Sequence, residues 1–163
     1  MREFLDTEFD EDGKTIELIS IALVAEDGRE FYACSTEVDL TRVSPWVRDN
    51  VLPHLPPVGD PRWMPRAQIR DGVRRHIETS LTKPEFWAYY ADYDWVAFCQ
   101  LFGRMIDLPK GWPMFCRDLK QLSVDVGSPR HPAQDGQAHN ALEDARWNKK
   151  LYDYLMGFRN GSR

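Results

Sequence analysis

Four carboxylates and one histidine, spread over the chain, have the side chains that metal-dependent phosphoryl chemistry needs. Asp6 and Glu8 stand two residues apart near the start, Asp94 lies mid-chain, and His139 precedes Asp144 near the end. Residues two apart on a strand point to the same face, so Asp6 and Glu8 would project side by side. Adjacent carboxylates repel each other unless a cation lies between them. Two divalent ions about 3.5–4 Å apart meet that need, because they take bridging oxygen ligands and a substrate phosphate.

The spacing of His139 and Asp144 predicts different settings for the two residues. Five residues on an ideal helix separate two side chains by about 140°, so the two cannot share one helical face. We expect His139 in the loop or first turn and Asp144 on the helix that follows. A histidine so placed is suited to take a proton from an attacking water at neutral pH.

The elements that must position these residues begin with strands. Residues 2–9, 15–25 and 30–35 have the pattern of β-strands, and Asp-Gly pairs mark the two turns between them. An antiparallel meander is the expected result. Ser44-Pro45 is a typical helix start, with a serine cap and a proline in the first turn.

The rest of the chain alternates between helices and strands. The expected elements are a helix from 45 to about 52, an irregular proline-rich loop at 53–65, an amphipathic helix at 66–80, a strand at 85–90, a helix from about 95 to 102, a strand at 111–116, a helix at 118–126, a polar loop at 127–138 and a last helix from about 140 to 158. Strands first and then mixed elements predict an α/β domain with a mixed sheet.

Composition indicates one domain, residues 1–163, in the cytoplasm. With 42% hydrophobic and 29% charged residues and no apolar run of 18, the sequence predicts no membrane span and no signal peptide. The three cysteines lack paired spacing, which favours reduced thiols. A net charge of −5 argues against binding nucleic acid by charge alone, although bound cations can invert the local field.

The motifs in this order resemble those of a known family. Asp6-x-Glu8, Tyr93-Asp94 before a helix and His139-x-x-x-x-Asp144 are similar to the three motifs of the DEDDh 3′-5′ exonucleases, and they span nearly the whole chain. Within that family the opening most resembles the mycobacterial RNase AS group, which is associated with adenylate-rich RNA. Many members carry an asparagine shortly before the second-motif aspartate, whereas this chain has Tyr90-Ala91-Asp92 there.

This resemblance implies a fold, an activity and a set of roles. The fold would be ribonuclease H-like, with a five-stranded mixed sheet flanked by α-helices, often in a homodimer. The activity would be that of a 3′-5′ exoribonuclease that releases nucleoside monophosphates from single-stranded RNA, with poly(A) preferred. Four carboxylates would hold two Mg²⁺ or Mn²⁺ ions and His139 would be the general base; the carboxylates are Asp6, Glu8, Asp94 and Asp144.

Several alternatives stay open from the sequence. Asp92 competes with Asp94 as the middle ligand, and Asp94 is favoured because an aromatic-Asp pair directly before a helix is the family's form. Phe9 could stack on the terminal base or simply pack, and Thr7 is a further candidate for substrate binding. A DNA exonuclease of proofreading type and a catalytically silent nucleic-acid-binding module are the alternative functions.

Other polar residues are given structural interpretations. Arg66, Arg70 and Arg74 recur every four residues, and a solvated or dimer-facing helix is favoured over a contact to RNA. We expect His54 and His131 at the surface, and no chemistry is assigned to them or to His76. These three histidines are therefore outside the predicted site.

Overall fold

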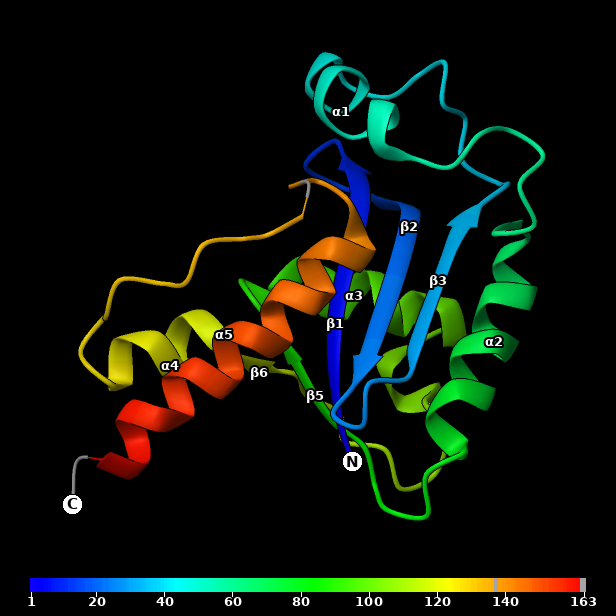
Figure 1. Ribbon diagram of the computed structural model, residues 1–163. Helices are drawn as coiled ribbons and strands as arrows, with labels where there is room; N and C mark the ends of the chain where they lie inside the picture. Colours follow the sequence, from blue (N-terminus) through cyan, green and yellow to red (C-terminus); the bar gives the residue numbers. More distant parts are fainter. Residues whose placement is uncertain (137, 162–163) are drawn as a thin grey trace.

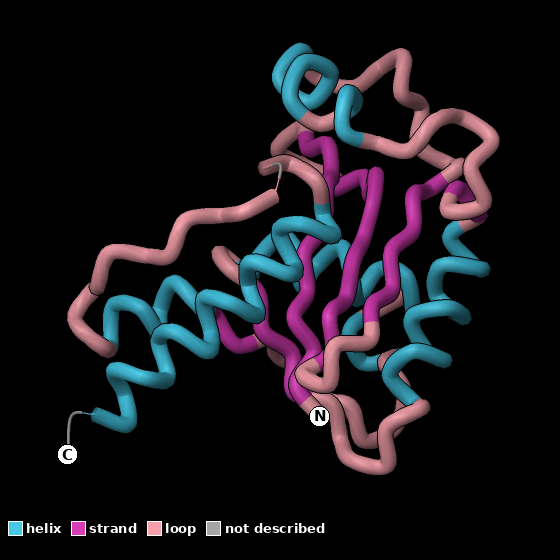
Figure 2. Tube along the Cα trace, viewed as in Figure 1, coloured by secondary structure: helices cyan, strands magenta, loops and turns pink. Residues whose placement is uncertain are grey.

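A mixed six-stranded sheet forms the centre of the computed structural model, which describes residues 1–136 and 138–161 (Figures 1 and 2). The strand order is β4-β3-β2-β1-β5-β6. The strands are β1 (Arg2–Glu11), β2 (Ile16–Ala25), β3 (Glu30–Ser35), β4 (Trp63–Met64), β5 (Glu85–Ala88) and β6 (Arg117–Asp118). The helices are α1 (Pro45–Asn50), α2 (Arg66–Glu78), α3 (Ala91–Phe102), α4 (Leu119–Asp125) and α5 (Ala141–Gly161), with short 3-10 turns η1 (Leu52–His54) and η2 (Met105–Asp107).

The three N-terminal strands form the predicted antiparallel meander. β1 pairs with β2 and β2 with β3, both antiparallel, while β5 lies parallel to β1 on its other side. The first turn is held by Asp12, whose carboxylate accepts hydrogen bonds from the backbone N–H groups of Lys14 and Thr15 at 2.9 and 2.7 Å. Gly13 in that turn has φ +80°, a conformation that glycine adopts without strain. β1 thus lies at the centre of the sheet.

Two cores, one on each face of the sheet, fix which way each β1 residue points. Leu5 packs on the face covered by α2 and α3, together with Ile69 of α2 and Phe98 of α3. Phe4 packs on the opposite face, against Leu151 of α5 and the helix α4 beside it. Even-numbered residues of β1 therefore point towards α5 and odd-numbered ones towards α3, as strand alternation requires.

The strand count and the position of one strand differ from the prediction. β4 lies within residues expected to form an irregular loop, so the sheet has six strands where five were expected. The strand expected at 111–116 is wrong, because β6 is Arg117–Asp118. Gly111 has φ +92° and Pro113 has no backbone N–H, and neither suits an extended ladder. β4 and β6 are two residues long and exist by pairing with β3 and β5.

Two helices also depart from their expected ends. α3 begins at Ala91 and not near residue 95, because the Asp118 carboxylate accepts a hydrogen bond from the Ala91 backbone N–H at 2.9 Å and so caps the helix from another element. Asp94 consequently lies in the first helical turn. α5 continues to Gly161, beyond the expected end near 158. Among the residues described, no helix combines the length and apolar character that crossing a bilayer requires.

Candidate active site

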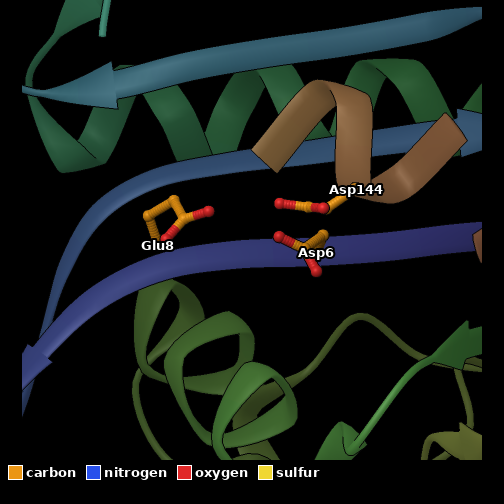
Figure 3. A group of neighbouring side chains, drawn as sticks. All are labelled: Asp6, Glu8 and Asp144. Atoms are coloured by element: carbon orange, nitrogen blue, oxygen red, sulfur yellow. The ribbon is translucent and has the colours of Figure 1, made fainter. Parts of the chain in front are cut away.

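Three carboxylates gather between β1 and the first turn of α5. Asp6 and Glu8 are even-numbered residues of β1 and point towards α5, which supplies Asp144 (Figure 3). One oxygen of each side chain lies within 4.8 Å of the oxygens of the other two. Glu8 is buried, and the other two are half-buried. This is a donor set of oxygen atoms in the spacing that a divalent cation could bridge.

Asp94 reaches the same strand from the α3 side. The pairing of β5 with β1 extends from Arg2 to Phe4, so the next residues of β1 have an open edge. At this edge, Asp94 Oδ1 accepts hydrogen bonds from the backbone N–H of Thr7 at 2.9 Å and from its hydroxyl at 2.6 Å. Asp94 is 6% exposed, whereas Asp92 is exposed to solvent. Of the two aspartates, Asp94 is the one that the fold directs at the carboxylate cluster.

Burial and mutual repulsion make these acids harder to ionise. Burial raises the pKa of Glu8 to about 8, and the charges of Asp144 and Asp94 act in the same direction. Burial also raises the pKa of Asp94 to about 7, against the two hydrogen bonds from Thr7. The pKa of Asp6 is raised well above its ordinary range, first by burial and then by the neighbouring carboxylates. In the described part of the chain, no Lys or Arg forms an ion pair with these four acids.

The start of α5 is held to the sheet by polar side chains that the sequence analysis missed. Asp144 accepts hydrogen bonds from the Asn140 backbone N–H at 3.1 Å and from the Gln134 amide at 2.5 Å. One turn later, the amide of Asn148 donates to the Leu5 carbonyl of β1 at 2.9 Å, and Asn148 is 1% exposed. The i, i+4 spacing of Asp144 and Asn148 could have signalled a shared face, but the contact of Gln134 has no local signal.

His139 lies in the loop before α5, the placement that its spacing predicted. Its backbone has φ +64°, in the left-handed region. Its ring meets the edge of the Trp46 ring, with centroids 5.0 Å apart and planes at 83°. The next residue, Asn140, donates a side-chain hydrogen bond to the His54 carbonyl at 3.0 Å, and this bond ties the loop to η1. The histidine is thus held between α1 and the start of α5.

The two candidate substrate contacts, Thr7 and Phe9, lie on the α3 side of β1. Thr7 is 5% exposed, and both of its donors bind Asp94, so it positions that acid. The register of β1 against β2 shifts between Glu8 and Phe9, and Phe9 stacks on Tyr93, with ring centroids 5.6 Å apart and planes at 14°. Tyr93 is 51% exposed, so this pair of rings reaches the surface.

Histidines and arginines outside the site have other partners. His54 and His131, both expected at the surface, are half-buried, and a ring nitrogen of His131 shares a 2.7 Å hydrogen bond with the hydroxyl of buried Ser123. The nitrogen of His76 lies 3.1 Å from a carboxylate oxygen of Glu3, and both side chains are buried. Each arginine of the α2 ridge has an acidic partner; these pairs are Arg66 with Glu17, Arg70 with Asp71 and Arg74 with Glu78.

Comparisons with known proteins agree with this geometry. The model of a family described as the 3′-5′ exoribonuclease Rv2179c-like domain matches residues 1–156. The 3′-5′ exoribonuclease Rv2179c of Mycobacterium tuberculosis is 52% identical over 160 residues, which are 98% of this chain and 92% of that protein.

Solved structures share the fold at low sequence identity. The nuclease domain of 3′hExo, a DEDDh family member bound to rAMP, superposes with a TM-score of 0.63 at 14% identity and covers 98% of this chain and 92% of its own. Pop2p of S. pombe, in a form with Mg²⁺ and Mn²⁺ bound, gives a TM-score of 0.61 at 13% identity and covers 99% and 83%. The predicted ribonuclease H-like α/β fold is thereby confirmed, with a sixth strand.

Proposed function

The chain belongs to the family of 3′-5′ exoribonuclease Rv2179c-like domains, and from this membership we propose that it shortens single-stranded RNA with two divalent metal ions. It is an exoribonuclease, so RNA is its substrate. The proposal concerns the finer points: the metal ions, the residues that hold them, the base preference and the action of residues 1–163 as one exonuclease domain.

One observation carries the metal proposal. The chain brings the carboxylate oxygens of Asp6, Glu8 and Asp144 within 4.8 Å of one another, with Asp94 beside them. Within the described residues, no basic side chain offsets this charge by an ion pair. Buried like charges at this distance are unfavourable unless protons or cations are bound. Hard oxygen donors in a half-buried cluster fit Mg²⁺ or Mn²⁺.

The proposed roles follow from where each side chain lies. Asp6, Glu8, Asp94 and Asp144 would hold the ions. When bound, two divalent ions activate a water and stabilise charge on a leaving oxygen. His139, at the loop beside these acids, would accept the proton of the attacking water on its imidazole. As the new bond to phosphorus forms, the bond to the 3′ oxygen of the penultimate nucleotide breaks, and a nucleoside 5′-monophosphate is released.

A preference for adenylate is the second part of the proposal. The protein has net charge −5, and Arg66, Arg70 and Arg74 of α2 are paired with acids, so charge alone offers little hold on a phosphate backbone. A site of this kind must bind the terminal nucleotide through its base and its 2′-hydroxyl, which distinguishes RNA from DNA. Likeness to the RNase AS group supports adenine as the base.

The test is a degradation assay with 5′-labelled homopolymers. We expect stepwise shortening of poly(A) from the 3′ end in Mg²⁺ or Mn²⁺, faster than that of poly(U), poly(C) or oligo(dA), and none in excess EDTA. Equal rates on all the RNA homopolymers would remove the adenylate preference. Faster degradation of DNA would favour the alternative of a proofreading-type exonuclease, and activity that persists in EDTA would exclude the metal mechanism.

A further inference from the structure

We propose that Gln134 is a positioning residue, which orients the Asp144 carboxylate for cation binding. This inference rests on the proposed metal site and adds to it a residue from outside the family's motifs. Gln134 lies ten residues before Asp144, in the segment that connects α4 to α5. Its amide Nε2 donates a hydrogen bond to Asp144 Oδ1 at 2.5 Å.

Donors from the loop before α5 fix both oxygens of Asp144, and the His139 backbone N–H also donates to this carboxylate. Oδ1 receives the Gln134 amide, and Oδ2 receives the Asn140 backbone N–H at 3.1 Å. Donors on both oxygens hold the plane of the carboxylate in one orientation. A carboxylate has about four lone-pair sites, so the hydrogen bonds from Gln134, Asn140 and His139 leave room for a cation. The contact therefore orients the ligand without occupying it fully.

The segment around Gln134 is anchored along α5. The indole of Trp147 donates to the Pro132 carbonyl at 3.1 Å, and the ammonium of Lys150 donates to the Ala133 carbonyl at 3.0 Å. Lys150 also forms a 2.6 Å ion pair with Asp135. The residues on either side of Gln134 are thus tied to the helix that carries Asp144. In Figure 1 this segment is the long connection that runs from α4 to the start of α5. Because its neighbours are anchored, the Gln134 side chain is presented to Asp144 at little entropic cost.

The chemistry of an amide suits this position. A lysine or arginine here would neutralise Asp144 and compete with the cation, whereas a glutamate would add a further negative charge to the cluster. Glutamine donates a hydrogen bond and carries no charge. Hydrogen bonds to a ligand from outside the coordination sphere commonly account for about 10–100-fold in metal affinity.

The decisive experiment measures metal binding and needs no turnover. Mn²⁺ is titrated into the metal-free protein in a calorimeter, for wild type, Gln134→Leu and two controls. Gln68→Leu makes the same change on the exposed face of α2. Asp144→Asn removes the negative charge of the ligand itself. The melting temperature of each metal-free protein is recorded in parallel.

We expect Gln134→Leu to weaken Mn²⁺ binding by about 10–100-fold, and Gln68→Leu to bind as wild type does. Wild-type affinity in Gln134→Leu would overturn the inference and leave the proposed metal site intact. If the wild type itself binds no Mn²⁺, the proposed function fails, and this inference fails with it. Should Gln134→Leu not fold, Lys150→Met, which releases the anchored segment, decides the question: weaker Mn²⁺ binding supports the inference, and unchanged binding overturns it.

Discussion

The two ends of β1 hold buried acids in opposite circumstances. Near the start of the strand, Glu3 is fully buried, and His76 of α2 places a ring nitrogen 3.1 Å from its carboxylate. A few residues further on, Asp6 and Glu8 face Asp144, another acid. The same strand thus gives one buried acid a partner from the chain and surrounds the others with like charges. Where the acid serves the fold, the chain provides the partner. At the other end, the partner that we propose is an external cation.

The largest effect on activity is expected when an acid is removed from the cluster of like charges. Asp6→Ala and Asp144→Ala should each abolish turnover, because each takes away a proposed metal ligand. Loss of one negative charge relieves repulsion, so the fold of the metal-free protein should be retained or stabilised.

Paired measurements of poly(A) hydrolysis and thermal melting check this prediction. Asp92→Ala, at an exposed aspartate two residues before Asp94, is the matched control and should retain activity. Substantial turnover by Asp144→Ala at saturating Mn²⁺ would remove that residue from the proposed site.

Removal of His139 should have the next largest effect. We expect His139→Ala to lower kcat by about 10²–10⁴, the usual contribution of a general base, with little change in Mn²⁺ affinity. The carboxylates that would bind the metal are carried by β1, α3 and α5, and the histidine lies in the loop outside them. Single-turnover rates and calorimetric Mn²⁺ titrations separate the two properties. A loss of affinity as severe as that of Asp144→Ala would identify His139 as a ligand and refute its role as the base.

The buried acids also predict how the stability of the metal-free protein depends on pH. Glu8 has a pKa of about 8 in the folded protein against 4.5 ordinarily, and the pKa of Asp94 is raised to about 7. Acids with raised pKa values stabilise the fold while protonated, so their contribution is complete at low pH and is lost as pH rises towards 8. Each kcal/mol lost lowers Tm by about 2–4 °C in a chain of this size, so a fall of several degrees between pH 5 and 8.5 is expected.

Melting curves in EDTA and in excess Mn²⁺ test this response. Mn²⁺ should reverse the slope, and Glu8→Gln should flatten it in EDTA and raise Tm at pH 8. His76→Leu is the contrasting change, because it leaves buried Glu3 without its partner and should destabilise the protein by about 1–3 kcal/mol. A metal-free Tm that rises steadily over this pH range would contradict the electrostatic account of the cluster.

The sequence predicted the parts of the molecule whose signals are local. The meander has apolar strand segments separated by Asp-Gly turns, and α1 has a serine cap at Ser44 that accepts from the Val47 N–H. The two-residue strands β4 and β6 have no pattern of their own, since they form by pairing with longer strands. Early initiation of α3 depends on Asp118, which is distant in sequence.

In the candidate site, too, the sequence predicted the features that have local signals and missed those that depend on tertiary contacts. Motif spacing identified the acids that the fold brings to one place, because strand and helix geometry carry that information. It did not identify Gln134, Asn148 or the pair of Glu3 with His76, which meet through tertiary contacts across many residues. Pairing partners of buried polar groups are set by the packing of whole elements and leave little trace in local sequence.

The smallest effect is expected at Phe9, which lies on the α3 side of β1, opposite to the side of Asp6 and Glu8. Phe9 stacks on the half-exposed ring of Tyr93, and it follows Glu8 directly. If this pair of rings receives the terminal base, Phe9→Ala should raise KM for poly(A) by about 5–150-fold, which corresponds to a stacking loss of about 1–3 kcal/mol, and leave kcat nearly unchanged. Phe115→Ala, at an exposed phenylalanine on the loop before β6, is the control and should leave KM as in wild type. An unchanged KM together with a lowered Tm would assign Phe9 to packing, and the contrast between the two ends of β1 would then concern the acids alone.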